Sequence, residues 1–121
     1  MRERTIRGAI TSANTKEAIL KDTKTMLTAM LAANDIQIKD ITAVLFTATQ
    51  DLTKVYPAVA ARELGIVHAS LMCIQEMAVE GSLEKCLRCM MTVQSEKKQA
   101  EMRHIYLNDA VKLRPDLTKT L

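Results

Sequence analysis

Two cysteines stand three positions apart in the stretch Cys86-Leu-Arg-Cys89, which is the spacing of redox and metal-binding thiol pairs. A redox pair needs its first thiol at a helix N-terminus, where the helix dipole and free N–H groups lower the pKa of the thiol. The residues that follow have the pattern of a strand, so residues 87–94 are predicted to be extended. Side chains three positions apart on a strand point to opposite faces, so we expect both thiols to pack as small apolar groups.

Other side chains that bind metals or attack substrates in proteins are scattered along the chain. Cys73, His68 and His104 provide no second tight pair of ligands for zinc. No serine or cysteine is placed by the sequence beside a histidine as its nucleophile. The sequence therefore predicts neither a metal site nor covalent catalysis.

Three arginines stand among apolar residues: Arg7, Arg88 and Arg114. For any one of them, exposure on a strand face or a salt bridge explains the pattern, because a buried guanidinium needs a partner. Three together favour an anionic ligand, since the planar guanidinium holds a carboxylate or phosphate through paired hydrogen bonds. The three glycines of the chain form no phosphate-binding loop, so a ligand with carboxylates fits the sequence better than one with phosphates.

Glu76 is the single acid in an otherwise uncharged stretch, residues 64–79. It either pairs with one of the arginines or accepts a hydrogen bond from a hydroxyl group of the ligand. The residues by themselves thus predict a cleft for a small polyanion and leave the role of Glu76 open.

The hydrophobic pattern predicts the elements that position these residues. A helix over residues 15–33 has apolar side chains at helical spacing and a cap signal at its start. Residues 41–49 are β-branched and apolar on both alternating faces, which is typical of a central strand. A second, shorter helix begins near Pro57 and ends before Gly65.

The remaining segments complete one sheet. The order β-α-β-α-β-β-β describes an α+β fold with one sheet and one long helix, in a single domain over residues 1–121. The other expected elements are a helical turn near Gly81-Ser82, strands over 5–10, 66–74 and 87–94, and an extended segment over 104–113 that is interrupted near Asn108-Asp109.

The composition argues against several classes of function. The 17 Lys and Arg residues are dispersed and the chain has one Phe, two Tyr and no Trp, so it lacks the basic stripe and stacking platforms of nucleic-acid binding. The N-terminus has no apolar signal-peptide segment, and the longest uncharged run, residues 64–75, is too short and polar to cross a bilayer. We expect a cytoplasmic protein with three reduced thiols.

The segments that contain these residues resemble the AroH-class chorismate mutases, in order and over nearly the whole chain. The resemblance implies an isomerase of aromatic amino acid biosynthesis in the shikimate pathway, which converts chorismate to prephenate by a Claisen rearrangement. It also implies a homotrimeric pseudo-barrel with a mixed five-stranded sheet and one long helix in each subunit, active sites between subunits, and no metal or cofactor. The motifs that carry it are Ile6-Arg7-Gly8-Ala9, Tyr56-Pro57-Ala58, Arg62-Glu63-Leu64, Cys73-Ile-Gln-Glu76-Met, Cys86-Leu-Arg88-Cys-Met-Met-Thr-Val-Gln94, Arg103-His104-Ile-Tyr106-Leu and Leu113-Arg114-Pro115-Asp116-Leu117.

The resemblance also implies roles for individual residues. Arg88 would place its guanidinium on the breaking ether oxygen and a substrate carboxylate. Arg7 would hold the side-chain carboxylate together with Tyr106, and Glu76 and Cys73 would contact the ring hydroxyl. The remaining implied site residues are Tyr56, Ala58 and Arg62 from the neighbouring subunit, Met72 beside Cys73, and Leu113 and Arg114 in a C-terminal segment that closes over the cleft.

Three positions depart from the pattern of the family. Val59 stands where family members often have a lysine, Met72 replaces a small or polar residue, and Cys89 replaces an aliphatic one. The alternative to an active mutase is a non-catalytic or regulatory trimer that binds an anionic metabolite in the same cleft. An imine or enamine hydrolase on a similar scaffold is a third reading, against which Glu76 and the several arginines argue.

Overall fold

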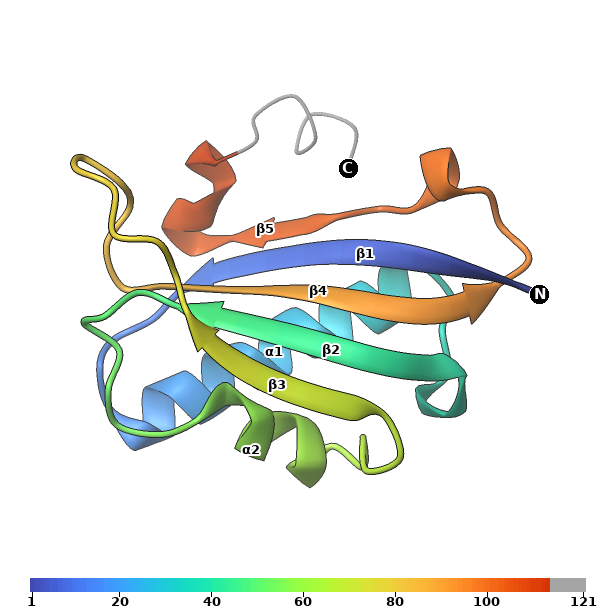
Figure 1. Cartoon of the computed structure of the whole chain (residues 1–121), viewed down its shortest axis with the longest axis horizontal. Coiled ribbons are helices and arrows are strands. Elements are labelled where there is room, and N and C mark those ends of the chain that lie inside the picture. The colour runs from blue at the N-terminus through green and yellow to red at the C-terminus, as the bar shows by residue number, and fades with distance from the viewer. Residues whose placement is uncertain (114–121) are drawn as a thin grey trace.

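Five strands form one mixed sheet in the computed structural model, which describes residues 1–113 (Figure 1). β4 is antiparallel to both β1 and β2, whereas β3 is parallel to β2 and β5 is parallel to β1. The predicted α+β fold with a mixed five-stranded sheet is confirmed. In spatial order the strands are β3 (Ser70–Gln75), β2 (Ile41–Ala48), β4 (Cys86–Ser95), β1 (Arg2–Thr11) and β5 (Ile105–Leu107).

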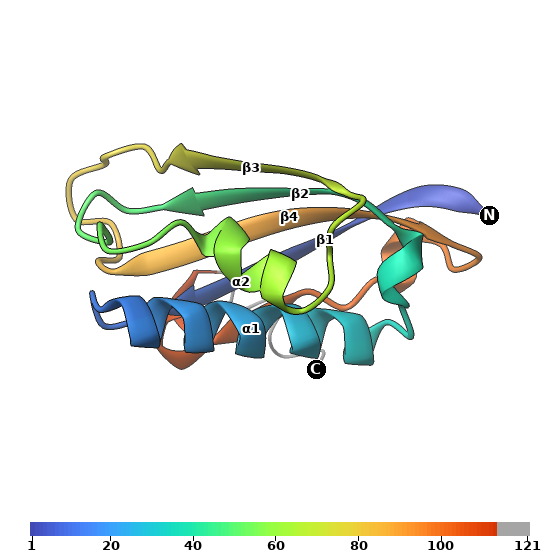
Figure 2. The same cartoon turned by 90° about the horizontal axis from the view of Figure 1, so that it is seen from below.

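Two α-helices lie on the same face of this sheet, and Figure 2 shows the opposite face without a helix over it. The 18-residue helix α1 (Lys16–Ala33) begins where predicted, because the Thr15 hydroxyl accepts a hydrogen bond from the Ala18 N–H at 3.0 Å. The 7-residue helix α2 (Pro57–Glu63) has proline at its first position. Three short 3₁₀ helices are η1 (Ile38–Asp40), η2 (Gln99–Glu101) and η3 (Asn108–Lys112). Within residues 1–113, neither α-helix combines the length and apolar character needed to span a membrane.

The hydrophobic core fills the space between α1 and the covered face of the sheet. Alternate residues of β1 and β4 point into it, among them the fully buried Ile6, Ile10, Leu87 and Met91. Gly8 lies between the two isoleucines, and a Cβ atom there would stand 2.5 Å from the sulfur of Met30 on α1. A glycine at this position therefore permits the close approach of helix and strand.

The predicted strand over residues 66–74 is wrong in its first part, because β3 begins at Ser70. Gly65 has a φ of +97° and its N–H donates to the Arg62 carbonyl at 3.0 Å. The Ile66 N–H donates to the Ala61 carbonyl at 3.0 Å, and its side chain is buried. This pair of hydrogen bonds is a Schellman motif, so Ile66 belongs to the end of α2 and not to a strand.

Two predictions near the C-terminal half are also wrong. Residues 79–82 form a turn in place of a helical turn: Gly81 has a φ of +80° and Ser82 N–H donates to the Val79 carbonyl at 3.0 Å, as in a type II turn. The extended segment over 104–113 is a strand only at Ile105–Leu107, and η3 follows. The interruption was predicted at the correct place, since Asn108 has a φ of 54°.

Candidate active site

The two faces of the sheet contain different kinds of side chain. The strand register places Thr47 opposite both Arg88 and Ile74, so these side chains share the face that the helices leave open. We call this the uncovered face. It also contains Arg7, which is opposite Met90, and Leu45, which is opposite both Met90 and Met72.

An ion pair joins two of the predicted site residues on the uncovered face. Arg88 Nη1 lies 3.2 Å from Glu76 Oε1, and the Thr47 hydroxyl donates to the same oxygen at 2.9 Å. The Glu76 backbone N–H donates to the Ala48 carbonyl at 2.9 Å, which fixes the residue just beyond the end of β3. A half-exposed guanidinium is thus held by a carboxylate that is itself held by β2.

Arg7 and Tyr106 line the same small hollow as Arg88 and Glu76. Its volume is about 230 Å³. Within residues 1–113, the Arg7 guanidinium has no carboxylate within ion-pair distance. Tyr106 is 5% exposed and packs with Ala9 and Ala110. We call Arg7, Glu76, Arg88 and Tyr106 the first half-site. An arginine without a carboxylate partner among the described residues can bind a carboxylate of a ligand through paired hydrogen bonds.

Another group of predicted site residues gathers around α2. The Cys73 thiol lies against the backbone of Ala58 and in the field of Arg62. Tyr56 is 71% exposed and lines a hollow of about 650 Å³ together with Cys73. We call Tyr56, Ala58, Arg62 and Cys73 the second half-site.

The sheet lies between the two half-sites of one chain. Cys73 is opposite the buried Phe46 in the register of β2 and β3, so its side chain is on the covered face. Glu76 contacts Arg88 on the uncovered face. The two residues that were predicted to contact one hydroxyl group therefore do not face the same space within a protomer.

The remaining predicted residues take different positions. Met72 is 62% exposed on the uncovered face, on the side of β3 opposite to Cys73. Leu113 packs against the cluster of Tyr106. Arg114 lies outside the described residues.

Cys86 and Cys89 are part of the packing around β4. β4 confirms that residues 87–94 are extended, and both thiols are free and buried. Burial raises the pKa of the Cys86 thiol to about 11 and that of the Cys89 thiol to about 12. Burial also raises the pKa of the Cys73 thiol. Thiols that resist ionisation are poor nucleophiles and poor metal ligands.

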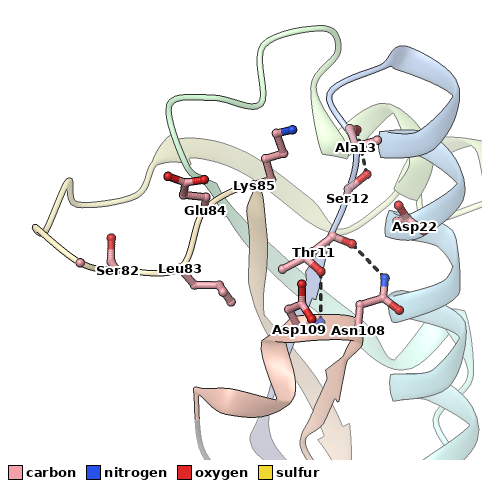
Figure 3. Close-up of a pocket in the computed structure, with 11 residues that line it drawn as sticks. Thr11, Ser12, Ala13, Asp22, Ser82, Leu83, Glu84, Lys85, Asn108 and Asp109 are labelled. Carbon is pink, nitrogen blue, oxygen red and sulfur yellow. Dashed lines mark hydrogen bonds between the residues drawn. The ribbon is translucent and has the colours of Figure 1, made fainter.

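A larger hollow of about 870 Å³ lies at the end of β1 and has the wrong charge for an anionic ligand (Figure 3). Three carboxylates line it, those of Asp22, Glu84 and Asp109, against the single ammonium of Lys85. We therefore assign the site by charge and not by volume. Across the part of the chain that the structure describes, no three His, Cys, Asp or Glu side chains lie close enough together to hold a metal ion.

Thr47 was not predicted as a site residue. Its hydroxyl holds Glu76, and its Cα is opposite that of Arg88. The alternation of the strand over residues 41–49 gives the face of Thr47, but the cross-strand partner depends on the order of strands in the sheet.

The fold and the first half-site together define an α+β protein with two arginines around one small hollow. A family model described as chorismate mutase type I matches residues 3–117. The chain is 46% identical to a chorismate mutase of Bacillus subtilis over 97% of this chain and 94% of that protein, and 45% identical to one of Thermus thermophilus over 94% and 95%. A solved chorismate mutase from Clostridium thermocellum shares the fold with a TM-score of 0.86 at 43% identity, over 88% of this chain and 96% of that chain.

The chain belongs to the chorismate mutase type I family. It is thereby an isomerase of aromatic amino acid biosynthesis, as the motifs around Arg7, Glu76 and Arg88 predicted.

Proposed function

We propose that this chain rearranges chorismate to prephenate and that the Arg88 guanidinium stabilises the negative charge that develops on the breaking ether oxygen. One observation carries the proposal: Arg88 is held by Glu76 on the uncovered face and shares a hollow with Arg7, whose guanidinium has no carboxylate partner among residues 1–113. Two cations around one hollow support the binding of a dicarboxylate with an ether bridge.

The reaction explains why this site needs neither a nucleophile nor a general base. In a Claisen rearrangement one C–O bond breaks and one C–C bond forms within the same molecule, and no proton moves. When the C–O bond lengthens first, the ether oxygen becomes partly anionic. A fixed cation there binds the transition state better than the substrate and so raises the rate. Holding the substrate in its compact conformer contributes the remaining acceleration.

Each residue of the first half-site has a part in this mechanism. Glu76 orients Arg88 through Oε1, which leaves Oε2 to accept a hydrogen bond from the ring hydroxyl of the substrate. Arg7 binds the side-chain carboxylate, with the phenol of Tyr106 beside it. Arg88 then reaches both the ether oxygen and a carboxylate because its five donors form a fork.

The second half-site is proposed to come from a neighbouring subunit of a homotrimer. Two observations support this. The hollow of the first half-site, about 230 Å³, is smaller than typical ligand pockets and needs further walls. The uncovered face also exposes Met72, Ile74 and Met90, which are large apolar side chains on β3 and β4, the two strands that flank β2. Association of copies through this face buries them and brings Tyr56 and Arg62 of one protomer toward Arg88 of another.

The experiment that tests the activity follows the loss of chorismate absorbance with the purified protein and identifies the product as prephenate. We expect turnover far above the spontaneous rate. Chorismate that disappears only at the spontaneous rate contradicts the proposal. If chorismate then still binds, as measured by calorimetry, the chain is a non-catalytic or regulatory binder of the metabolite.

A further inference from the structure

The edge of β1 beside β5 obtains several of its hydrogen-bond partners from side chains. β5 pairs only with Gly8 to Ile10 of the ten-residue strand. Toward the N-terminal end of β1, the Gln99 carboxamide donates to the Thr5 carbonyl at 2.7 Å and accepts from the Thr5 N–H at 2.9 Å. At the other end, Asn108 Nδ2 donates to the Thr11 carbonyl at 3.0 Å.

His104 occupies the position between these partners. Its Nδ1 accepts the backbone N–H of Arg7 at 2.9 Å. Residues 5, 7 and 11 are alternate positions of β1, so these groups all point to the same edge. In this contact Nδ1 acts as the acceptor, so it carries no proton of its own.

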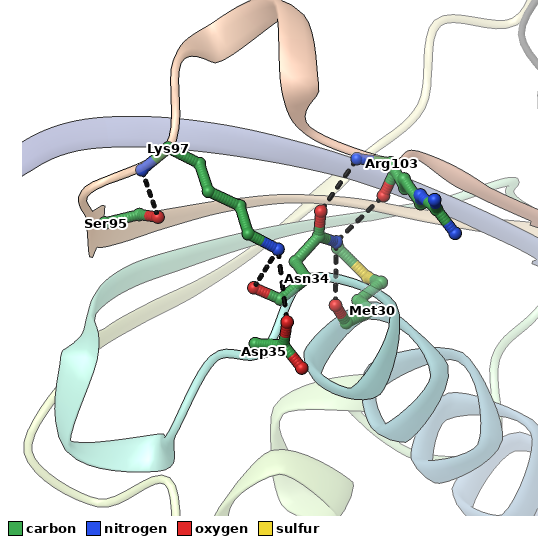
Figure 4. A network of polar contacts seen from close by, with 6 residues as sticks. All are labelled: Met30, Asn34, Asp35, Ser95, Lys97 and Arg103. Atoms are coloured by element: carbon green, nitrogen blue, oxygen red, sulfur yellow. Dashed lines mark hydrogen bonds and ion pairs between the residues drawn. The ribbon is translucent and has the colours of Figure 1, made fainter.

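The backbone just before His104 is fixed by a buried amide (Figure 4). Asn34 is 1% exposed at the end of α1. Its Nδ2 donates to the carbonyls of Met30 and Arg103, each at 2.9 Å, and its Oδ1 accepts the Arg103 N–H at 2.7 Å. All polar atoms of this side chain have partners, so α1 holds the segment that directs His104 to β1.

We propose that His104 is a positioning residue for Arg7, and that its imidazole fixes the stretch of β1 from which the Arg7 guanidinium enters the hollow. Within the described residues no carboxylate holds that guanidinium, so its direction depends on its backbone. Without the imidazole, a half-buried N–H of β1 has no acceptor and the strand must shift to find one. The role rests on the proposed function of Arg7 as the anchor of a substrate carboxylate.

The test compares His104→Asn with His104→Leu. The two new side chains have nearly the same shape, but only asparagine has an acceptor, Oδ1, where histidine has Nδ1. We expect His104→Leu to raise KM for chorismate about tenfold with kcat within about twofold, and His104→Asn to restore KM to within about twofold of the wild type. Gln99→Leu is the control, because it removes the partner of Thr5 on the same edge; we expect lower stability and unchanged KM.

Equal KM values for the asparagine and leucine variants overturn the positioning role. His104→Ala repeats the comparison with asparagine if the leucine variant does not fold.

Arg7→Ala is measured in parallel. If Arg7→Ala leaves KM unchanged, the proposed function of Arg7 fails, and the positioning role fails with it. If Arg7→Ala raises KM and His104→Leu does not, only the positioning role fails. In the Arg7→Ala background, we expect His104→Leu to cause no further rise in KM, and an additive rise contradicts the inference.

Discussion

The two half-sites differ in how the protomer holds them. In the first half-site, Arg88 pairs with Glu76, and Thr47 donates a hydrogen bond to the same carboxylate. In the second half-site, Tyr56 and Arg62 are exposed around the short helix α2. Within residues 1–113, Arg62 makes neither an ion pair nor a side-chain hydrogen bond.

The difference shows which part of the site is prepared before the substrate arrives. A cation that stabilises a transition state is most effective when its orientation costs nothing during the reaction, and Arg88 meets this condition within one protomer. In the proposed trimer, the second half-site supplies walls and a further cation.

The largest effect is expected from removing the charge of the first half-site. Replacing Arg88 by its neutral isostere citrulline should lower kcat at least about 10²- to 10³-fold, because one donor to a developing oxyanion is typically worth that much. The thermal unfolding temperature should stay near that of the wild type, since Arg88 is half-exposed. Arg2→citrulline, at the exposed start of β1, is the control and should leave kcat unchanged. A near-normal kcat in the Arg88 variant would contradict the proposal that the charge of Arg88 stabilises the transition state.

The next effect concerns the surface that brings the half-sites together. Met72→Asp should dissociate the trimer, because it places an unpaired charge in the proposed interface. Light scattering should report the mass of a single chain, and kcat/KM should fall while circular dichroism retains the native signal. Val67→Asp, which changes a 61% exposed residue outside the strands, should leave both mass and activity unchanged. A Met72→Asp protein that stays trimeric contradicts the proposed interface.

A smaller effect is expected on the covered face, where stability and not rate should change. Gly8→Ala introduces a Cβ atom 2.5 Å from the sulfur of buried Met30 and should lower the free energy of unfolding by about 2 kcal/mol. Gly81→Ala has open space around it but a φ of +80°, so it should cost about 1 kcal/mol. Urea unfolding of both variants measures the difference. Equal losses would show that α1 moves away from β1 without cost.

The smallest effect is expected from the two thiols of β4. Cys86→Ser and Cys89→Ala should change stability more than kcat. Burial raises the pKa of both thiols above their ordinary value of 9.0, so the folded state keeps the protons that the unfolded chain loses. This stabilisation is complete below pH 9 and is lost as the pH rises toward 11 and 12. The free energy of unfolding should therefore fall above pH 9, and less steeply in the Cys86→Ala, Cys89→Ala double variant; an unchanged slope would contradict the assignment.

Much of the fold could be predicted because local signals and packing agree. The cap at Thr15, the proline at position 57 and the alternation along β4 each specify an element that the structure contains. The errors lie where backbone geometry competes with side-chain pattern. Ile66 is apolar and β-branched like a strand residue, but the hydrogen bonds of the Schellman motif place it at the end of α2.

The site could be predicted only in part. Its residues were found from their residue types and from the family resemblance, but which of them lie together depends on the order of strands in the sheet. Arg88 and Glu76 are twelve positions apart, and only the pairing of β2 with both β3 and β4 brings them together. The same register separates Cys73 from Glu76. Contacts such as that of His104 with Arg7, 97 positions apart, have no local signal at all. The cytoplasmic location stays a prediction.

The most direct test of a site built from two half-sites is complementation between two impaired variants. Arg88→Ala disables the first half-site and Arg62→Ala the second. Co-expressed with different affinity tags and purified through both, the mixed trimers contain some sites in which neither substitution occurs. Every trimer that contains both variants has one such site among its three, so roughly a third of the wild-type sites are restored, provided that each site takes one half from each of two protomers. A kcat/KM near that fraction supports the account, whereas a mixture no more active than the two separate variants contradicts it.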